Sequence, residues 1–209
     1  MKGQLFVILF FFLFPVIHSQ PVISLPAPQK SGGMPLMEAL SKRATSRAFD
    51  TRDLTRQQLS DLLWAAWGIN RPDGKRTAPS ARNMQETDIY VLLREGVYLY
   101  RAQEHDLSLV LAEDVRAMGG TQEFVKDAPV TLVFVADLAK MGDRPLEGKL
   151  QTANIDVGYI SQNVYLYCAS EGLATGARGR VDREKLAPRL KLREDQAIIL
   201  AQSVGYPGK

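Results

Sequence analysis

Residues 146–170 carry a helical repeat that is long enough to fix the centre of the fold of this 209-residue sequence. Apolar and small residues recur there three and four positions apart, which is the spacing of one face of an α-helix. The stripe comprises Leu150, Ala153, Val157, Ile160 or Ser161, Val164 and Cys168. Gly172 ends the pattern, so we predict one central helix over this range. The small residues Ala153, Gly158 and Ser161 would allow close approach of another helix, and a second subunit could share this one.

Residues 1–20 are expected to be a secretory signal rather than part of the fold. Lys2 precedes the uninterrupted apolar run Leu5–Phe14, and the small residue Ser19 follows. Because the run is shorter than the roughly 20 residues that a spanning helix needs, we predict cleavage near Ser19 or Gln20 and export to the periplasm. An uncleaved segment that anchors the protein is the alternative. Removal of this segment lowers the net charge from +3 to +2, because Lys2 is its one charged residue.

One domain of ordinary size follows this segment. Residues 21–34, with three prolines and two glycines, are expected to be an extended lead-in, and residues 35–209 to form the domain. Thr55 and Gln58 form a capping box for a helix that Gly68 stops. The other predicted helices are 36–43, 121–127, 146–170 and one that starts at Asp182; the predicted strands are 88–94, 97–101, 130–135 and 197–204, and 107–111 is open between strand and helix. Helices around a few strands, without a strict βαβ alternation, indicate an α+β fold.

The residues that usually carry catalysis are scarce in this chain. The single cysteine, Cys168, excludes an internal disulfide framework and a cysteine-cluster zinc site, and we expect it to be buried and inert. The only histidines are His18, which lies in the predicted signal, and His105, which lies in a polar loop and is expected to be exposed. A multi-histidine metal site and a Ser–His–Asp hydrolase are therefore hard to build, which points to a borrowed cofactor. Basic and acidic residues are interspersed, so we expect no nucleic-acid partner.

Two polar segments could bind an anionic, planar molecule. Arg43 and Arg47 lie four positions apart and would share a face on helical backbone, with Thr45 between them. Guanidinium groups bind phosphate through charge-assisted hydrogen bonds, and a hydroxyl can complete the shell. The loop that begins at Pro79 and contains Asn83 could offer backbone and amide groups to a heterocycle. Taken singly, the arginines could equally be solvated surface groups, and the loop simply a loop.

Four motifs, in order, resemble the nitroreductase family of FMN-dependent oxidoreductases. Residues 43–49, Arg-Ala-Thr-Ser-Arg-Ala-Phe, resemble its Arg-x-Ser-x-Arg-x-Phe opening, and residues 79–85 resemble its Pro-Ser-x-x-Asn-x-Gln loop. Residues 156–173 resemble its long core helix, and residues 200–207 its last strand and Gly-Tyr-Pro tail. The resemblance covers residues 35–209. Within the family, residues 63–70 and 96–100 look most similar to the branch of azoline-oxidising dehydrogenases.

The resemblance implies a nitroreductase-like α+β fold with a central mixed sheet surrounded by helices. It also implies an intertwined homodimer with two FMN sites at the subunit interface. At the phosphate end, Arg43 and Thr45 would bind the FMN phosphate, and Lys209 would close on it. Thr45 keeps the hydroxyl of the serine that is more usual there.

At the ring end, the resemblance implies that Arg47 would reach the pyrimidine side of the flavin and stabilise negative charge there. Pro79, Ser80 and Asn83 would contact the isoalloxazine ring from the partner subunit. Gly179 and Arg180 would supply the stretch whose backbone faces flavin N5; some members carry glutamate where Gly179 stands.

The implied activity is ping-pong transfer of hydride or electrons through flavin N5, to or from a small organic substrate such as a nitroaromatic or a quinone. The flavin would carry the chemistry, with no catalytic side chain and no metal. NAD(P)H or another donor would supply the electrons, and the predicted export favours a donor other than a nicotinamide. A non-catalytic flavin-binding dimer, acting as a carrier or a sensor, is the alternative.

Overall fold

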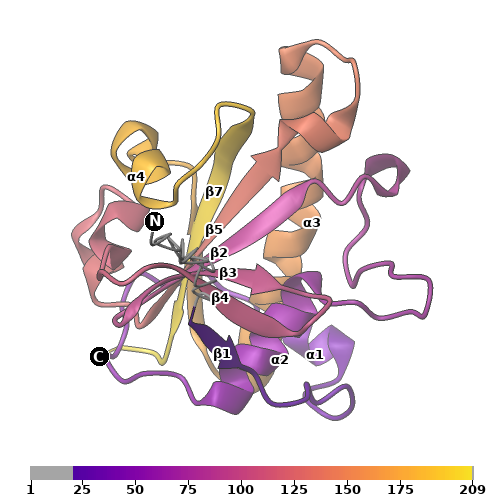
Figure 1. The fold of residues 1–209 in the computed structure, drawn as a ribbon. Coiled ribbons are helices and arrows are strands. Elements are labelled where there is room, and N and C mark those ends of the chain that lie inside the picture. The colour runs from indigo at the N-terminus through magenta and orange to yellow at the C-terminus, as the bar shows by residue number, and fades with distance from the viewer. Residues whose placement is uncertain (1–20, 209) are drawn as a thin grey trace, which may run out of the picture.

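The chain folds around one sheet whose two faces are both covered (Figure 1). A computed structural model describes residues 21–208. The predicted secretory signal and Lys209 therefore lie outside the described residues. Four α-helices and seven strands within that range confirm the α+β class. No helix in residues 21–208 is both long enough and apolar enough to cross a membrane.

The sheet has the strand order β1-β4-β3-β2-β5-β7-β6. Its strands are β1 (Val22–Ser24), β2 (Thr87–Leu93), β3 (Gly96–Arg101), β4 (Asp106–Leu111), β5 (Val130–Asp137), β6 (Ala174–Arg178) and β7 (Gln196–Gly205). Every pairing among these strands is antiparallel, so the expectation of a mixed sheet is wrong for the described chain. Tight turns reverse the chain between β2, β3 and β4. Strands β5 and β6 run in the same direction, but β7 lies between them and pairs antiparallel with both.

The helices are α1 (Leu36–Lys42), α2 (Arg56–Trp67), α3 (Leu146–Glu171) and α4 (Arg183–Arg189). Short 3₁₀ turns add η1 (Ala81–Asn83), η2 (Arg116–Gly119), η3 (Glu123–Lys126) and η4 (Leu138–Met141). The predicted capping box forms at Thr55 and Gln58, and Gly172 ends α3 in the left-handed conformation. The predicted helix over 121–127 is the 3₁₀ turn η3, and the ambiguous residues 107–111 belong to strand β4.

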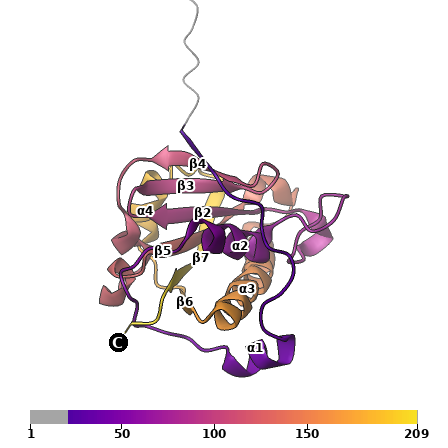
Figure 2. The ribbon, with the colours of Figure 1, turned by 90° about the horizontal axis from the view of Figure 1, so that it is seen from below.

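Alternation along β5 creates two separate cores. Leu132 and Phe134 point to the face that α2 and α3 cover, whereas Val133 and Val135 point to the face that α4 covers. On the first face, the predicted stripe of α3 is buried from Ala153 to Cys168, while Leu150 is half-buried. Helix α1 lies beside α3 at the edge of the molecule, far from β4 (Figure 2). Helix α3 is thus the central scaffold on which the candidate site is built.

The predicted lead-in is better ordered than its composition suggests. Residues 22–24 form edge strand β1, which pairs with β4, and the backbone carbonyl of Pro26 accepts a hydrogen bond of 2.6 Å from Ser60 Oγ. The same Ser60 Oγ lies 2.7 Å from Nε2 of His105, whose Nδ1 lies 3.0 Å from the Tyr100 hydroxyl. His105 is therefore half-buried and bonded through both ring nitrogens, and the expectation that it is exposed is wrong. Its polar neighbours in sequence gave no sign of these tertiary partners.

Candidate functional site

The first predicted anion-binding segment leaves α1 and runs beside strand β6. Helix α1 ends at Lys42, so Arg43 and Arg47 do not share a helical face as expected. The Ser46 N–H instead donates to the carbonyl of Thr175 at 2.8 Å. A Cβ on Gly176 would lie 2.6 Å from the Ser46 carbonyl oxygen, so this close approach requires glycine. The segment is therefore held against β6 through its backbone, so that contact does not use the side chains of Arg43, Thr45 and Arg47.

Tyr165 of α3 organises the side chains of this segment. Its hydroxyl accepts a 2.9 Å hydrogen bond from the Ala177 N–H and lies 3.0 Å from Thr45 Oγ1. Since the backbone N–H can only donate, the tyrosine proton is free to be donated to Thr45. The Thr45 proton can then point outward. The Arg43 guanidinium carbon also lies 5.2 Å from the Tyr165 ring centroid, within range of a cation–π contact. Sequence reasoning missed Tyr165, because it lies outside the apolar stripe of its helix.

Several arginines lie in this segment and at the end of β6. Within residues 21–208, Arg43, Arg47 and Arg180 form no ion pair with a carboxylate. Arg47 and Arg180 are exposed, and Arg43 is half-buried on Tyr165. Arg178 of β6 is 7% exposed, and its guanidinium donates to the carbonyls of Gly119 and Gly176. Burial lowers the pKa of Arg178 to about 10. An anion bound beside Thr45 would meet the Arg43 guanidinium, which has no carboxylate partner in residues 21–208.

A small cavity lies between this segment, α3 and β6. It has a volume of about 170 Å³, and its polar lining comes from Lys42, Ser46, Tyr165 and Thr175. The hydroxyls of Ser46 and Thr175 donate to the carbonyls of Ala48 and Ser203, and Lys42 is paired with Glu38, so these donors are already engaged. A larger cavity of about 370 Å³ lies between α2, α3 and the lead-in, but it is lined by none of the predicted site residues.

The second predicted segment, residues 79–85, is a strained loop held on α3. The Ala81 N–H donates to Asp156 Oδ2 at 2.9 Å, and the Gln85 N–H donates to Ser80 Oγ at 3.1 Å. Arg82, Asn83 and Gln85 all have positive φ angles, of 52°, 55° and 48°. Such angles are costly for residues other than glycine and persist only where surrounding contacts impose them. Pro79 and Asn83 are exposed, so the loop presents them to the outside.

The two segments do not meet within one chain. Their anchors on α3, Tyr165 and Asp156, are nine residues apart, which is about 13 Å along a helix. The structure thus brings Arg43 and Thr45 together, but holds Pro79, Ser80 and Asn83 elsewhere on α3. Gly179 and Arg180 follow directly after β6 and are exposed. Lys209 lies outside the described residues.

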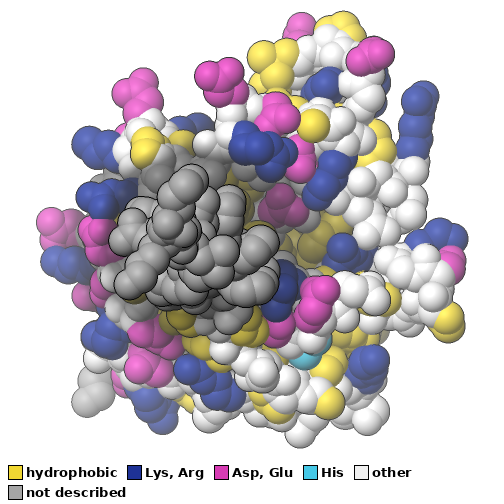
Figure 3. All heavy atoms as spheres, viewed as in Figure 1, with side chains coloured by type: hydrophobic (Ala, Val, Ile, Leu, Met, Phe, Trp, Pro, Cys, Tyr) yellow, Lys and Arg dark blue, Asp and Glu magenta, His cyan; other side chains and the backbone are white. Residues whose placement is uncertain are grey.

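On the face shown in Figure 3, lysine and arginine side chains lie among aspartate and glutamate side chains, with no large region of one sign. Within residues 21–208, Arg43, Arg47 and Arg180 are distinguished from the ion-paired arginines by the absence of a carboxylate partner.

The sequence profile of the nitroreductase family matches residues 40–206, which include both segments, α3 and β7. The chain belongs to the nitroreductase family. It is 31% identical over 179 residues to the "Putative nitroreductase MJ1384" of Methanocaldococcus jannaschii, and the match covers 79% of this chain and 88% of that protein. This membership supports an oxidoreductase of nitroreductase type.

Solved structures agree with this assignment. A putative nitroreductase from Ralstonia eutropha JMP134 superposes with a TM-score of 0.86 at 43% identity, over 90% of both chains. A putative NAD(P)H:FMN oxidoreductase from Staphylococcus epidermidis shares the fold, with a TM-score of 0.65 at 17% identity over 88% of this chain and 92% of that one. The nitroreductase-like fold is thereby confirmed. The resemblance to the azoline-oxidising branch stays a prediction.

Proposed function

We propose that this nitroreductase-family protein is an FMN-dependent oxidoreductase whose phosphate site is built from Arg43 and Thr45. The observation that carries the proposal is the Thr45 hydroxyl, held on Tyr165 beside arginines that have no carboxylate partner in residues 21–208. This donor set fits a phosphate group, because it combines a fixed hydroxyl with guanidinium groups that can form charge-assisted hydrogen bonds. Lys209 is proposed to close on the same phosphate.

When bound, the flavin would supply hydride transfer at N5 in two half-reactions of ping-pong type. The chain itself would bind and orient the ring. We assign Arg47, which is exposed, to the pyrimidine side, where a cation favours negative charge by direct Coulomb attraction. Gly179 and Arg180, exposed after β6, are assigned to the backbone stretch that faces the reactive atom.

The site is proposed to be completed by a second copy of the chain. Pro79, Ser80 and Asn83 are held away from Arg43 within one chain, so they would reach the ring from the partner subunit, as the family resemblance implies. Exposed apolar side chains on α1 and α3 support a homodimer: Leu36 is 62% exposed, Met37 76%, Ile155 53% and Tyr159 49%. Association would remove such large apolar side chains from water.

The substrates are proposed at the level of chemical class. The S. epidermidis protein of the same fold is named an NAD(P)H:FMN oxidoreductase, which supports a nicotinamide donor. If residues 1–20 export the chain, a donor other than a cytosolic nicotinamide would be needed. The acceptor would be an electron-poor planar compound such as a nitroaromatic or a quinone. Fractionation of cells that express the full chain tests the predicted export, and recovery in the cytosol alone would refute it.

The absorption spectrum of the purified protein tests the proposed cofactor. A yellow flavin band that is released as FMN on denaturation is expected. A colourless protein that does not bind added FMN contradicts the proposal. Anaerobic reduction of the bound flavin, followed by mixing with a quinone or a nitroaromatic, then tests catalysis. If no acceptor reoxidises it, the protein is the non-catalytic flavin carrier or sensor instead.

A further inference from the structure

Two buried carboxyl groups meet beneath the loop of residues 79–85. Glu86 lies between this loop and β2 and is 0% exposed, and Asp156 of α3 is 3% exposed. The Glu86 carbonyl accepts a 2.8 Å hydrogen bond from the Asp137 N–H, which fixes its backbone at the end of β5. The resemblance assigns neither carboxyl group to the site.

The hydrogen bonds of this pair are incomplete when both groups are ionised. Asp156 Oδ2 accepts the Ala81 N–H at 2.9 Å. Neither carboxyl oxygen of Glu86 has a hydrogen-bond donor of good geometry among the described residues. Ionised carboxylates are acceptors only, and an unpaired buried charge is costly. A proton on Glu86 would allow it to donate a hydrogen bond to Asp156, which would remove one of the two buried charges and leave Asp156 as the ionised acceptor for Ala81.

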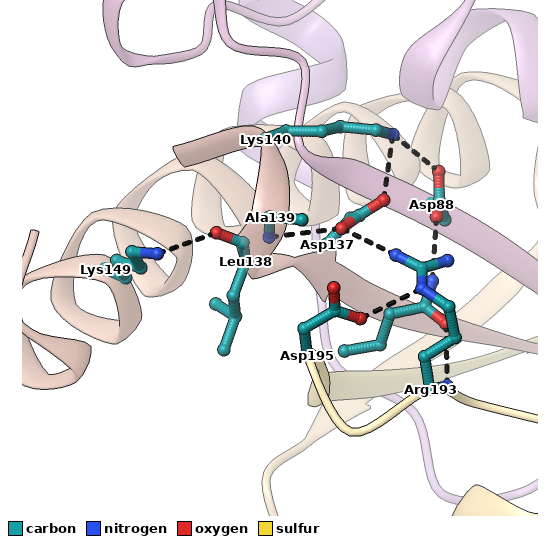
Figure 4. Close-up of polar contacts among 9 residues, drawn as sticks. Asp88, Asp137, Leu138, Ala139, Lys140, Lys149, Arg193 and Asp195 are labelled. Atoms are coloured by element: carbon teal, nitrogen blue, oxygen red, sulfur yellow. Dashed lines mark hydrogen bonds and ion pairs between the residues drawn. The ribbon is translucent and has the colours of Figure 1, made fainter. Parts of the chain in front are cut away.

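The charged surroundings also favour one proton on the pair. The pKa of Glu86 is raised to about 7, chiefly by burial and also by the neighbouring Asp156 carboxylate, while the residue's own backbone N–H acts to lower it. Lys140 of η4 is the cation that acts on Glu86, but it already lies 3.3 Å from Asp88 and 3.8 Å from Asp137 (Figure 4). The guanidinium of Arg144 contacts the sulfur of Met84, a residue of the loop.

The loop depends on this anchor because both of its ends converge on Asp156. Ala81 is bonded to Asp156 directly, and Glu86, five residues later, is its carboxyl neighbour. Between these two points lie three left-handed residues, whose strain only tertiary contacts can impose. If both carboxyls were ionised, like charges would repel in a dry site and water would have to enter, which would free the loop.

We propose that Glu86 and Asp156 are a positioning pair that shares one proton, and that this proton holds residues 79–85 in the conformation that binds the flavin ring. The inference rests on the proposed function, since the loop carries Pro79, Ser80 and Asn83. Flavin affinity should then fall as the pair loses its proton near neutral pH.

Titration of the flavin-free protein with FMN at pH 6 and pH 8 tests this inference. If only the protonated pair binds, the apparent Kd rises about tenfold between these values, since a midpoint near 7 leaves about one tenth of the protein competent at pH 8. The FMN phosphate itself titrates in this range, so the comparison with Glu86→Gln is decisive. The glutamine mimics the protonated acid, and its Kd should change with pH at least fivefold less than that of the wild type.

Two further variants provide a second test and a control. Asp156→Asn can still accept from Ala81 and can donate to Glu86, so it should flatten the pH dependence even if Glu86→Gln fails to fold. Asp61→Asn is the control: it removes a buried carboxylate that accepts hydrogen bonds from Gln29 and Gln57 and lies outside the pair. The Kd of this variant for FMN should keep the wild-type pH dependence. Equal pH dependence in the wild type and both pair variants would overturn the proposal.

Infrared spectroscopy supplies a readout that needs no flavin. The wild-type protein should show a protonated carboxyl C=O band that disappears with a midpoint near pH 7 and is missing in Glu86→Gln. Absence of that band in the wild type would overturn the shared proton. If the band is present and FMN binds at neither pH, the proposed function is wrong, and the role of the pair in flavin binding fails with it. FMN binding of equal strength at both pH values would overturn this role alone.

Discussion

The hydroxyl of Tyr165 lies 3.0 Å from the hydroxyl of Thr45, and it accepts the backbone N–H of Ala177 at 2.9 Å. Three elements meet at this oxygen: the segment after α1, helix α3 and strand β6. The tyrosine therefore couples the central helix to a side chain that the family resemblance places on the FMN phosphate. A residue that touches no cofactor can in this way set the direction of a ligand-binding hydroxyl.

Tyr165→Phe should weaken FMN binding without unfolding the protein. The variant removes the hydroxyl while keeping the ring beneath Arg43. One hydrogen bond contributes about 0.5–1.5 kcal/mol, so we expect the Kd for FMN to rise about 3- to 10-fold. Fluorescence titration of FMN measures the change. Tyr98→Phe on strand β3, which lies outside the proposed site and the proposed dimer surface, is the control, and an equal effect in both variants would contradict the role of Tyr165.

Replacing both Arg43 and Arg47 with alanine should strongly weaken FMN binding. Charge-assisted hydrogen bonds contribute about 1.5–3 kcal/mol each, so the double variant should bind FMN more than about 100-fold more weakly. The remaining affinity should also depend less on salt, because fewer charges attract the phosphate. Arg189→Ala, which breaks an exposed ion pair with Glu113, is the control. Retention of the flavin band in the double variant would refute the assigned phosphate site.

Local signals predicted most of the fold. Each of three local patterns can be identified from residues that are close together in the sequence, and each appears where expected. They are the capping box at Thr55, the helix end at Gly172 and the β-branched run of β5. Strand β6 was missed because Thr175, Gly176 and Arg178 look like a loop. It is a strand because all of its residues pair with β7, a tertiary contact that its own sequence does not show.

The candidate site shows the same division between local and tertiary information. The motif containing Arg43 and Thr45 was recognisable, but the helical face assigned to the arginines was wrong because α1 ends at Lys42. Tyr165 and the pair of Glu86 with Asp156 come from contacts across the fold, and neither has a characteristic spacing. Geometry was needed to find them.

A charge on the exposed face of α3 should separate the subunits of the proposed dimer. Ile155→Arg places a cation at a side chain that is 53% exposed in the single chain and would be buried on association. Analytical ultracentrifugation should show a monomer, with FMN affinity reduced because the partner's loop is absent. Val22→Arg on edge strand β1, where the side chain is 46% exposed, is the matched control. A dimer that survives Ile155→Arg would place the association surface elsewhere.

The free energy of unfolding should decrease as the pH rises, because the environment of Glu86 raises the pKa of its carboxyl group. Its pKa is raised from 4.5 to about 7, so the folded state holds a proton that the unfolded chain loses first. The stabilisation from this group is complete below pH 4.5, decreases as the pH rises towards 7 and is absent above 7. Glu86→Gln removes this dependence. Its stability relative to the wild type should therefore increase between pH 4.5 and pH 7, by on the order of 1–3 kcal/mol. Urea unfolding of both proteins across this range measures the difference, and parallel stability curves would show that the Glu86 carboxyl is not perturbed in the folded protein.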